Sequence, residues 1–151
     1  MLRLWRLYRA AHGPGLDGIG GTFASGRWHL QGQRVVYLGA TPAIVVLERL
    51  AHTDPDLLPA DLQLGCFEFP KSAHADKLDD RARLPGNWIF DEQTTRRLGD
   101  AWLRENSTAL LQVPSALLPE ESNYLFNPRN SEAQHLHPVS ERPFAFDPRL
   151  L

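Results

Sequence analysis

Short apolar runs, divided by polar or glycine-rich segments, make up most of the hydrophobic pattern along the chain. Runs of roughly four to eight residues rich in branched aliphatic and aromatic side chains are typical of β-strands. The pattern predicts strands over residues 2–8, 27–30, 34–38, 62–69 and 109–113, with shorter ones near 124–126 and 144–146. Residues 35–38 are apolar or aromatic in succession, so we expect both faces of that strand to be covered.

Two segments have the features of helices. Thr41 and Pro42 supply an N-cap and a first-turn proline, and the run 43–50 has the length and composition of a buried helix. Asp91 or Glu92 can open a second helix, whose apolar side would carry Thr95, Leu98, Trp102 and Leu103. The pattern therefore predicts one α+β domain over residues 1–151, built of short, mostly antiparallel strands and two principal helices.

Glycine and proline mark the segments without regular structure. Residues 13–26 are rich in glycine and predict a long loop, and the polar stretch 70–85 predicts an exposed one. The glycines at 15, 18 and 20 have the reverse of the G-x-G-x-x-G spacing, so they are a weak signal for dinucleotide binding of the Rossmann type. Five prolines after residue 118 predict a mostly extended or turned tail.

Composition narrows the class of protein. A formal net charge of −2 gives no general attraction to nucleic acid or to an anionic membrane, so we expect neither as a direct partner. Cys66 is the only cysteine, which excludes an internal disulfide and agrees with a cytoplasmic location. Arginines interrupt the leucines of residues 2–9, and no apolar run approaches the roughly 20 residues of a membrane span.

Glu48 is an anomaly in the first predicted helix. Residues 43–47 are all apolar, and Ile44 and Ala51 lie on the same side of the helix as the carboxylate. Burying a lone charge costs several kcal/mol unless the charge is paired or hydrogen-bonded. Glu48 therefore needs either a structural partner, such as a nearby arginine, or a functional reason, and the residues alone do not decide between them.

Three further residues combine a polar group with a position next to a loop or strand end. Arg27 follows flexible backbone and can grip phosphate with its planar fork, or it can be a surface arginine stacked on Trp28. Tyr37 lies on an apolar strand, where a tyrosine is ordinarily part of the core. Ser115 follows a strand end, where loops present polar groups to ligands and where serine is also common in turns.

Metal and serine-hydrolase chemistry find no support. Of the six histidines only His135 and His137 are close in sequence, and no acidic or cysteine pattern completes a metal site, so we predict none. No G-x-S-x-G motif is present to form a nucleophile elbow.

Taken in order, these residues resemble the RES domain family, which is named for its arginine, glutamate and serine. The blocks that carry the resemblance are Gly26-Arg27-Trp28-His29, Val35-Val36-Tyr37, Pro42-Ala43 with Leu47-Glu48, Leu84-Pro85-Gly86-Asn87-Trp88, Leu98-Gly99-Asp100-Ala101-Trp102-Leu103, Val113-Pro114-Ser115-Ala116, and Glu121-Ser122-Asn123-Tyr124-Leu125-Phe126-Asn127-Pro128. They span nearly the whole chain in order. Ser25 stands where the family usually has a second glycine, and His29 where it usually has asparagine.

The resemblance implies a fold similar to that of ADP-ribosyltransferases and a toxin that consumes NAD. Such toxins break the bond between nicotinamide and ribose, and the resemblance favours phosphorolysis to ADP-ribose-1″-phosphate, with NAD as substrate, inorganic phosphate as co-substrate and no cofactor. A protein ADP-ribosyltransferase and an inactive co-repressor module are the alternatives. The implied partner is an antitoxin with an Xre-type helix-turn-helix domain, and whether homo-oligomers form within that complex stays open.

The resemblance also implies roles for particular residues. Arg27, Tyr37 and Glu48 would be catalytic: Glu48 would stabilise positive charge on the ribose, Arg27 would hold pyrophosphate or phosphate, and Tyr37 would pack against nicotinamide or ribose. Ser115 would contact the ligand from the opposite lip of the cleft. Arg9 and Asn127 are weaker candidates for ligand contacts, and either could equally be structural.

Overall fold

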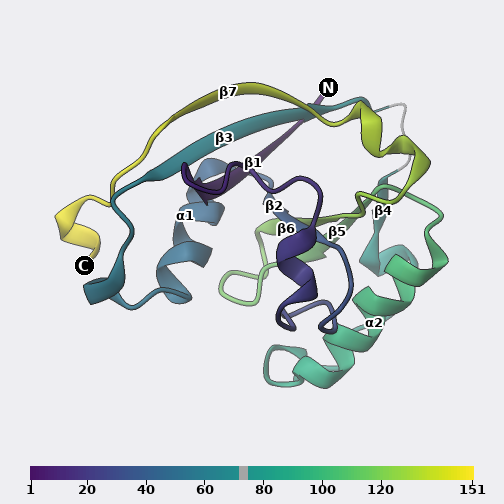
Figure 1. The fold of residues 1–151 in the computed structure, drawn as a ribbon. Helices are drawn as coiled ribbons and strands as arrows, with labels where there is room; N and C mark the ends of the chain where they lie inside the picture. Colours follow the sequence, from purple (N-terminus) through teal and green to yellow (C-terminus); the bar gives the residue numbers. More distant parts are fainter. Residues whose placement is uncertain (72–74) are drawn as a thin grey trace.

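The computed structural model describes residues 1–71 and 75–151 and arranges them around one seven-stranded sheet (Figure 1). The strands are β1 (Leu2–Arg9), β2 (Val36–Gly39), β3 (Leu62–Phe69), β4 (Ala75–Lys77), β5 (Leu110–Pro114), β6 (Ser122–Phe126) and β7 (His137–Pro143). Their order across the sheet is β4-β5-β6-β2-β1-β3-β7, and every pair is antiparallel except the parallel pair β4–β5. The predicted α+β class with mostly antiparallel strands is confirmed.

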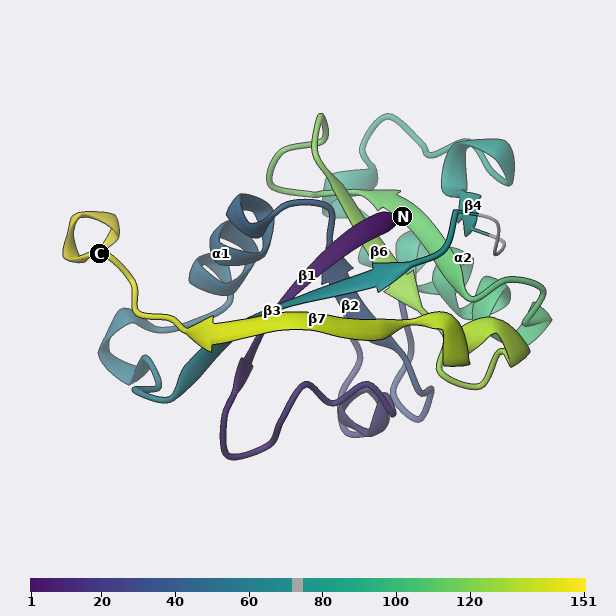
Figure 2. The same ribbon diagram turned by 90° about the horizontal axis from the view of Figure 1, so that it is seen from above.

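The two predicted helices are present and begin where their caps indicate. In α1 (Pro42–Ala51) the Thr41 side chain accepts a hydrogen bond from the Ile44 amide. In α2 (Glu92–Glu105) the Asp91 carboxylate accepts one from the Thr94 amide. The helices lie over different parts of the sheet, α1 against β1 and β2 and α2 near β5 (Figure 2).

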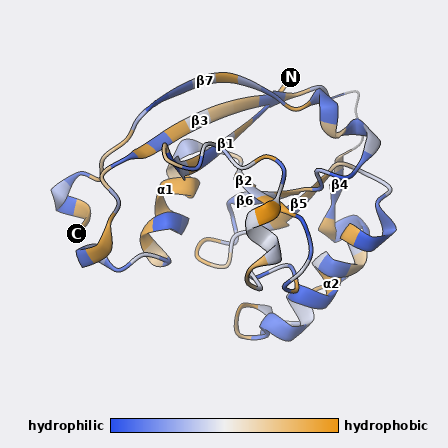
Figure 3. Ribbon diagram, viewed as in Figure 1, coloured by the Kyte–Doolittle hydropathy of each residue, from blue (hydrophilic) through white to orange (hydrophobic). Residues whose placement is uncertain are grey.

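The strand alternation builds two apolar clusters on opposite faces of the sheet. On β5, Leu110 belongs to the first cluster, whereas Leu111 and Val113 belong to the second. Trp102 and Leu103 of α2 cover the second cluster, although α2 is mostly hydrophilic along its length (Figure 3). The middle of the sheet is therefore buried on both faces, as expected for the segment that contains β2.

Three predictions about local structure are wrong. Residues 27–30 form a turn closed by an isolated bridge between Gly26 and His29, not a strand. Residues 144–146 are not a strand either; the last strand is β7, which is exposed along its whole length and so lacks an apolar alternation. The predicted loop 70–85 contains β4 and a short 3-10 helix, and its residues 72–74 lie outside the described residues.

The residues described include no helix with enough length and apolarity to cross a bilayer.

Candidate active site

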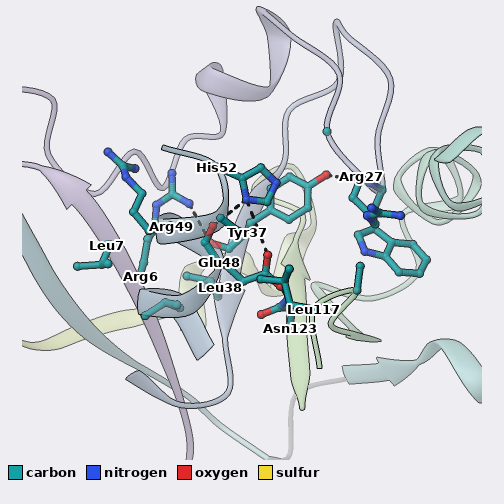
Figure 4. A pocket seen from close by; sticks show the side chains of 15 residues that line it. Arg6, Leu7, Arg27, Tyr37, Leu38, Glu48, Arg49, His52, Leu117 and Asn123 are labelled. Atoms are coloured by element: carbon teal, nitrogen blue, oxygen red, sulfur yellow. Dashed lines mark hydrogen bonds and ion pairs between the residues drawn. The ribbon is translucent and has the colours of Figure 1, made fainter. Parts of the chain in front are cut away.

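A cavity of about 510 Å³ opens between β1, β2, α1 and the turn at residues 26–28 (Figure 4). Its walls include Arg27, Tyr37 and Glu48, the three residues proposed from sequence as catalytic. Cavities of roughly 300–1,000 Å³ are typical of small-molecule sites. The fold thus brings together three side chains from a turn, a strand and a helix.

The Glu48 carboxylate is held by neutral hydrogen-bond donors. Its Oε1 atom accepts hydrogen bonds from the Ser115 hydroxyl at 2.8 Å and from the Asn123 amide at 2.9 Å. Its Oε2 atom lies 3.9 Å from Nδ1 of His52, and the side chain is 25% exposed. One oxygen is therefore fixed while the other has no hydrogen bond to a described residue, which leaves a positioned negative charge in the cavity wall.

The hydroxyl of Tyr37 is occupied by the turn at residues 26–29. It lies 2.7 Å from Nδ1 of His29 and accepts a hydrogen bond from the Trp28 amide at 3.1 Å. The other ring nitrogen of His29 faces the carbonyl oxygens of Gly21 and Ala24, at 3.0 and 2.9 Å, so it must carry the proton. Nδ1 is then an acceptor, and the Tyr37 hydroxyl donates to it.

Burial raises the pKa of Tyr37 well above its ordinary value. The phenol is therefore neutral at physiological pH, and its hydroxyl serves as an anchor for the turn. A Cβ atom on Gly26 would lie only 2.6 Å from this hydroxyl, so the close approach requires glycine. Tyr37 offers the cavity its ring, while its polar end fixes the turn.

Arg27 extends from that turn and is held mainly by the backbone. Its Nη1 donates to the Ile89 carbonyl oxygen at 2.8 Å, and its Nη2 lies 3.6 Å from a carboxylate oxygen of Glu92. The turn itself rests on α2, where the Thr95 hydroxyl donates to the Arg27 carbonyl oxygen at 2.6 Å. A Cβ on Gly99 would come within 1.8 Å of the Trp28 carbonyl oxygen, so only glycine permits this contact between helix and turn.

Comparison with known proteins identifies the family. Residues 3–147 match the RES domain. A protein of Pseudomonas putida named Toxin Res is 40% identical over 149 residues, which cover 97% of this chain and 98% of that protein. The chain belongs to the RES domain family.

Other relatives agree with this RES domain assignment, and one solved structure has the same fold. A Sphingobium protein named Prs ADP-ribosylating toxin is 31% identical over 97% of this chain and 95% of its own. A Toxin Res of Yersinia enterocolitica is 35% identical over 88% of both chains. The crystal structure of the M. tuberculosis MbcT-MbcA toxin-antitoxin complex matches with a TM-score of 0.76 and 17% identity, over 94% of this chain and 83% of that one. This last likeness supports the fold.

The remaining residues expected at the site lie beside the cavity of this RES domain or away from it. Ser115 is fully buried and its hydroxyl donates to Glu48, so it does not line the cavity itself, whereas Ala116 and Leu117 do. Arg9 forms an ion pair with Asp61 at 2.9 Å and does not line the cavity.

Asn127 is buried at a distance from the cavity lining. Its amide donates to the Asn106 side chain at 3.0 Å, and its oxygen accepts from the Arg129 amide at 3.1 Å. The bond to Asn106 joins the end of β6 to the end of α2, and the bond from Arg129 closes the turn that follows β6, so both favour a structural role for Asn127.

Sequence reasoning missed four polar residues of the cavity: Arg6, Arg49, His52 and Asn123. Arg6 could have been suspected because it interrupts an apolar strand, and Asn123 because it lies in one of the blocks that resemble the family. Nothing in the sequence distinguishes Arg49 or His52 from ordinary residues at the exposed end of a helix. Across residues 1–71 and 75–151, no three side chains of the metal-ligating types gather.

Proposed function

We propose that this RES domain is the toxin of a toxin–antitoxin system and an enzyme that cleaves the nicotinamide–ribose bond of NAD. Three of its relatives are named Toxin Res, and another is named Prs ADP-ribosylating toxin. ADP-ribosylation takes its ADP-ribose from NAD, so it breaks the same bond. The proposal places the reaction in the cytoplasm.

One observation carries the proposal: a fixed carboxylate shares a cavity with an arginine and the ring of a tyrosine. Departure of neutral nicotinamide takes the bonding electron pair with it and leaves positive charge on the ribose. Glu48, with Oε1 bound by Ser115 and Asn123, would stabilise that charge without having to reorganise. Tyr37 would pack its ring on the nicotinamide or ribose, and Arg27 would hold a phosphate of the ligand.

Phosphorolysis is the favoured outcome. An oxygen of inorganic phosphate would donate an electron pair to the ribose carbon, giving ADP-ribose-1″-phosphate and nicotinamide, with no cofactor required. The alternative, supported by the name of the Sphingobium relative, uses a protein side chain as acceptor in place of phosphate. Both outcomes use the same cavity and the same carboxylate.

The test combines product analysis with variants. Purified protein is incubated with NAD and labelled phosphate, and we expect release of nicotinamide together with label in ADP-ribose-1″-phosphate. Loss of the positioned charge in Glu48→Gln should slow the reaction by about 10²–10³-fold. Glu68→Gln, which removes a carboxylate paired with Arg3 outside the cavity, is the matched control.

Three results would change the proposal. Label from NAD fixed on a protein, with no free phosphorylated product, would favour the ADP-ribosyltransferase. NAD binding without nicotinamide release would indicate an inactive module. Equal turnover by the Glu48→Gln variant and the parent would refute the role of Glu48.

We also propose an antitoxin partner of the Xre helix-turn-helix type. The MbcT-MbcA structure is of a toxin-antitoxin complex, which supports an antitoxin as partner for a chain with the same fold. The helix-turn-helix type of that antitoxin rests on the resemblance of the sequence to the RES domain family. Co-expression with the helix-turn-helix protein of a neighbouring gene should give a stable complex that does not consume NAD. A complex that consumes NAD as fast as the free domain would contradict neutralisation at this site.

A further inference from the structure

Two arginines in the cavity lie on the side of Glu48 away from Arg27 (Figure 4). Arg6 comes from β1 and Arg49 from the last turn of α1. Neither is within ion-pair distance of a carboxylate among the described residues. Neither guanidinium group therefore has a carboxylate in direct contact, although the Glu48 carboxylate lies in the same cavity.

The contacts of the two guanidinium groups differ. Arg6 donates through Nε to the Pro14 carbonyl oxygen and through Nη1 to the Tyr37 carbonyl oxygen, both at 2.8 Å. The Nε atom of Arg49 is buried and has no hydrogen-bond partner among the residues described. Burying a donor without a partner costs free energy. Because Arg49 also lines the cavity, a ligand there can accept hydrogen bonds from the other nitrogen atoms of its guanidinium group.

The pKa values of Arg6 and Arg49 also indicate that the two positive charges lack a counter-charge in direct contact. Burial, with the charge of Arg49 as the second cause, lowers the pKa of Arg6 to about 10. Burial also lowers the pKa of Arg49, with Arg9 adding to the effect. Both lowered pKa values mean that the surroundings disfavour the charged form of these arginines. A bound anion would favour the charged form and so offset that cost.

Structural explanations account for only part of this arrangement. The bonds of Arg6 to two carbonyl oxygens tie β1 to the loop at Pro14 and to β2, but they leave its charge without a counter-charge. Arg49 lies in the last turn of α1, where the helix dipole favours a cation. That effect operates at the surface and does not require the Nε atom to be buried.

We propose that Arg6 and Arg49 together bind a phosphate group in this cavity. Guanidinium groups suit phosphate because their planar forks donate paired hydrogen bonds to its oxygens. Arg27, by contrast, already contacts a carbonyl oxygen and a carboxylate. The source of the phosphate group rests on the proposed function: it is either the orthophosphate that attacks the ribose or the pyrophosphate of NAD.

Binding measurements test the pair without relying on turnover. Calorimetric titrations with inorganic phosphate and with ADP-ribose are made on the parent, on Arg49→Met and on Arg6→Met. Arg3→Met removes an exposed arginine from the same strand as Arg6 and serves as the control for the change in net charge. Because Arg6→Met can disturb β1, Arg6→Lys is included to keep the positive charge.

The two sources give different results. If the pair binds orthophosphate, both Met variants should weaken phosphate binding at least tenfold and leave ADP-ribose binding nearly unchanged. If it binds the pyrophosphate, ADP-ribose binding should weaken instead. The Arg3→Met protein should bind both probes like the parent. Parent-like binding of both probes by Arg49→Met, or no binding of either probe by the parent, would overturn the proposal.

The melting temperature is a second measurement, because it should change in a different direction if Arg49 binds phosphate than if its role is only structural. Without phosphate, Arg49→Met should raise the melting temperature, because it removes a charged group whose Nε atom is buried without a hydrogen-bond partner. With saturating probe, the parent should gain stability and this variant should not. A lower melting temperature for Arg49→Met in phosphate-free buffer would count against the inference. Absence of NAD cleavage alongside these binding effects would refute the proposed reaction and leave the phosphate site standing.

Discussion

Replacing Tyr37 by phenylalanine removes one oxygen atom and leaves the ring that lines the cavity. The hydroxyl accepts from the amide of Trp28 and donates to Nδ1 of His29, and both of these residues are 3% exposed. His29 cannot compensate by moving its proton, because its other nitrogen faces the carbonyl oxygens of Gly21 and Ala24. The change therefore leaves one buried donor and one buried acceptor without a partner.

The magnitude follows from these two groups. An unsatisfied buried hydrogen-bonding group costs roughly 1–3 kcal/mol. With about 1.5 kcal/mol for each of these two neutral groups, the free energy of unfolding should fall by about 3 kcal/mol. In a domain of this size each kcal/mol lowers the melting temperature by roughly 2–4 °C, which gives an expected decrease of about 6–12 °C.

Urea unfolding and thermal melting followed by circular dichroism would measure both quantities. Tyr124→Phe is the matched control, because Tyr124 is buried in the core and its hydroxyl has no hydrogen bond to any residue the structure describes. We expect the control to unfold within about 0.5 kcal/mol of the parent. Parent-like stability of Tyr37→Phe, or an equal loss in both variants, would refute the anchoring role of the hydroxyl.

Three further changes test other contacts. Ser115→Ala removes a hydrogen bond to the Glu48 carboxylate that is worth roughly 1.5 kcal/mol or more. The change should lower kcat about tenfold and leave KM nearly unchanged. If it lowers kcat by the same factor in a Glu48→Gln background, Ser115 does not act through Glu48. Gly99→Ala forces the turn at Trp28 outward and should cost roughly 1–3 kcal/mol of stability in urea titrations, together with NAD turnover. Burial and the bond to a carboxylate raise the pKa of Tyr8 from 10.0 to about 12, so the folded state holds this proton more tightly. The free energy of unfolding should therefore fall as pH rises from 10 through about 12. Chemical denaturation at several pH values should show a smaller fall for Tyr8→Phe over the same pH range.

Local sequence signals predicted the elements that have caps or apolar runs. Thr41 and Pro42 mark the start of α1, and the apolar run 62–69 coincides with β3. The exposed strand β7 could not be found in this way, because its position at the sheet edge depends on pairing with β3 and not on its own apolar residues. The turn at residues 27–30 was mistaken for a strand because Trp28 is buried by α2, a tertiary contact.

A site residue could be predicted where a charged side chain interrupted an apolar segment. Glu48 stood out because a carboxylate on an apolar helix needs an explanation, and the structure supplies Ser115 and Asn123 as its partners. Arg6 and Arg49 come from different elements, and only the fold brings them to one cavity. Their missing counter-charge is a property of the tertiary structure, which no pattern along the chain expresses.

The central claim is that NAD binds in this cavity with its reacting ribose against Glu48. A crystal structure of the slow Glu48→Gln variant with NAD tests it most directly. We predict the nicotinamide-bearing ribose next to the side chain at position 48, with the ring of Tyr37 in contact with the ligand. Well-ordered NAD bound elsewhere on the domain, with this cavity empty, would contradict the account.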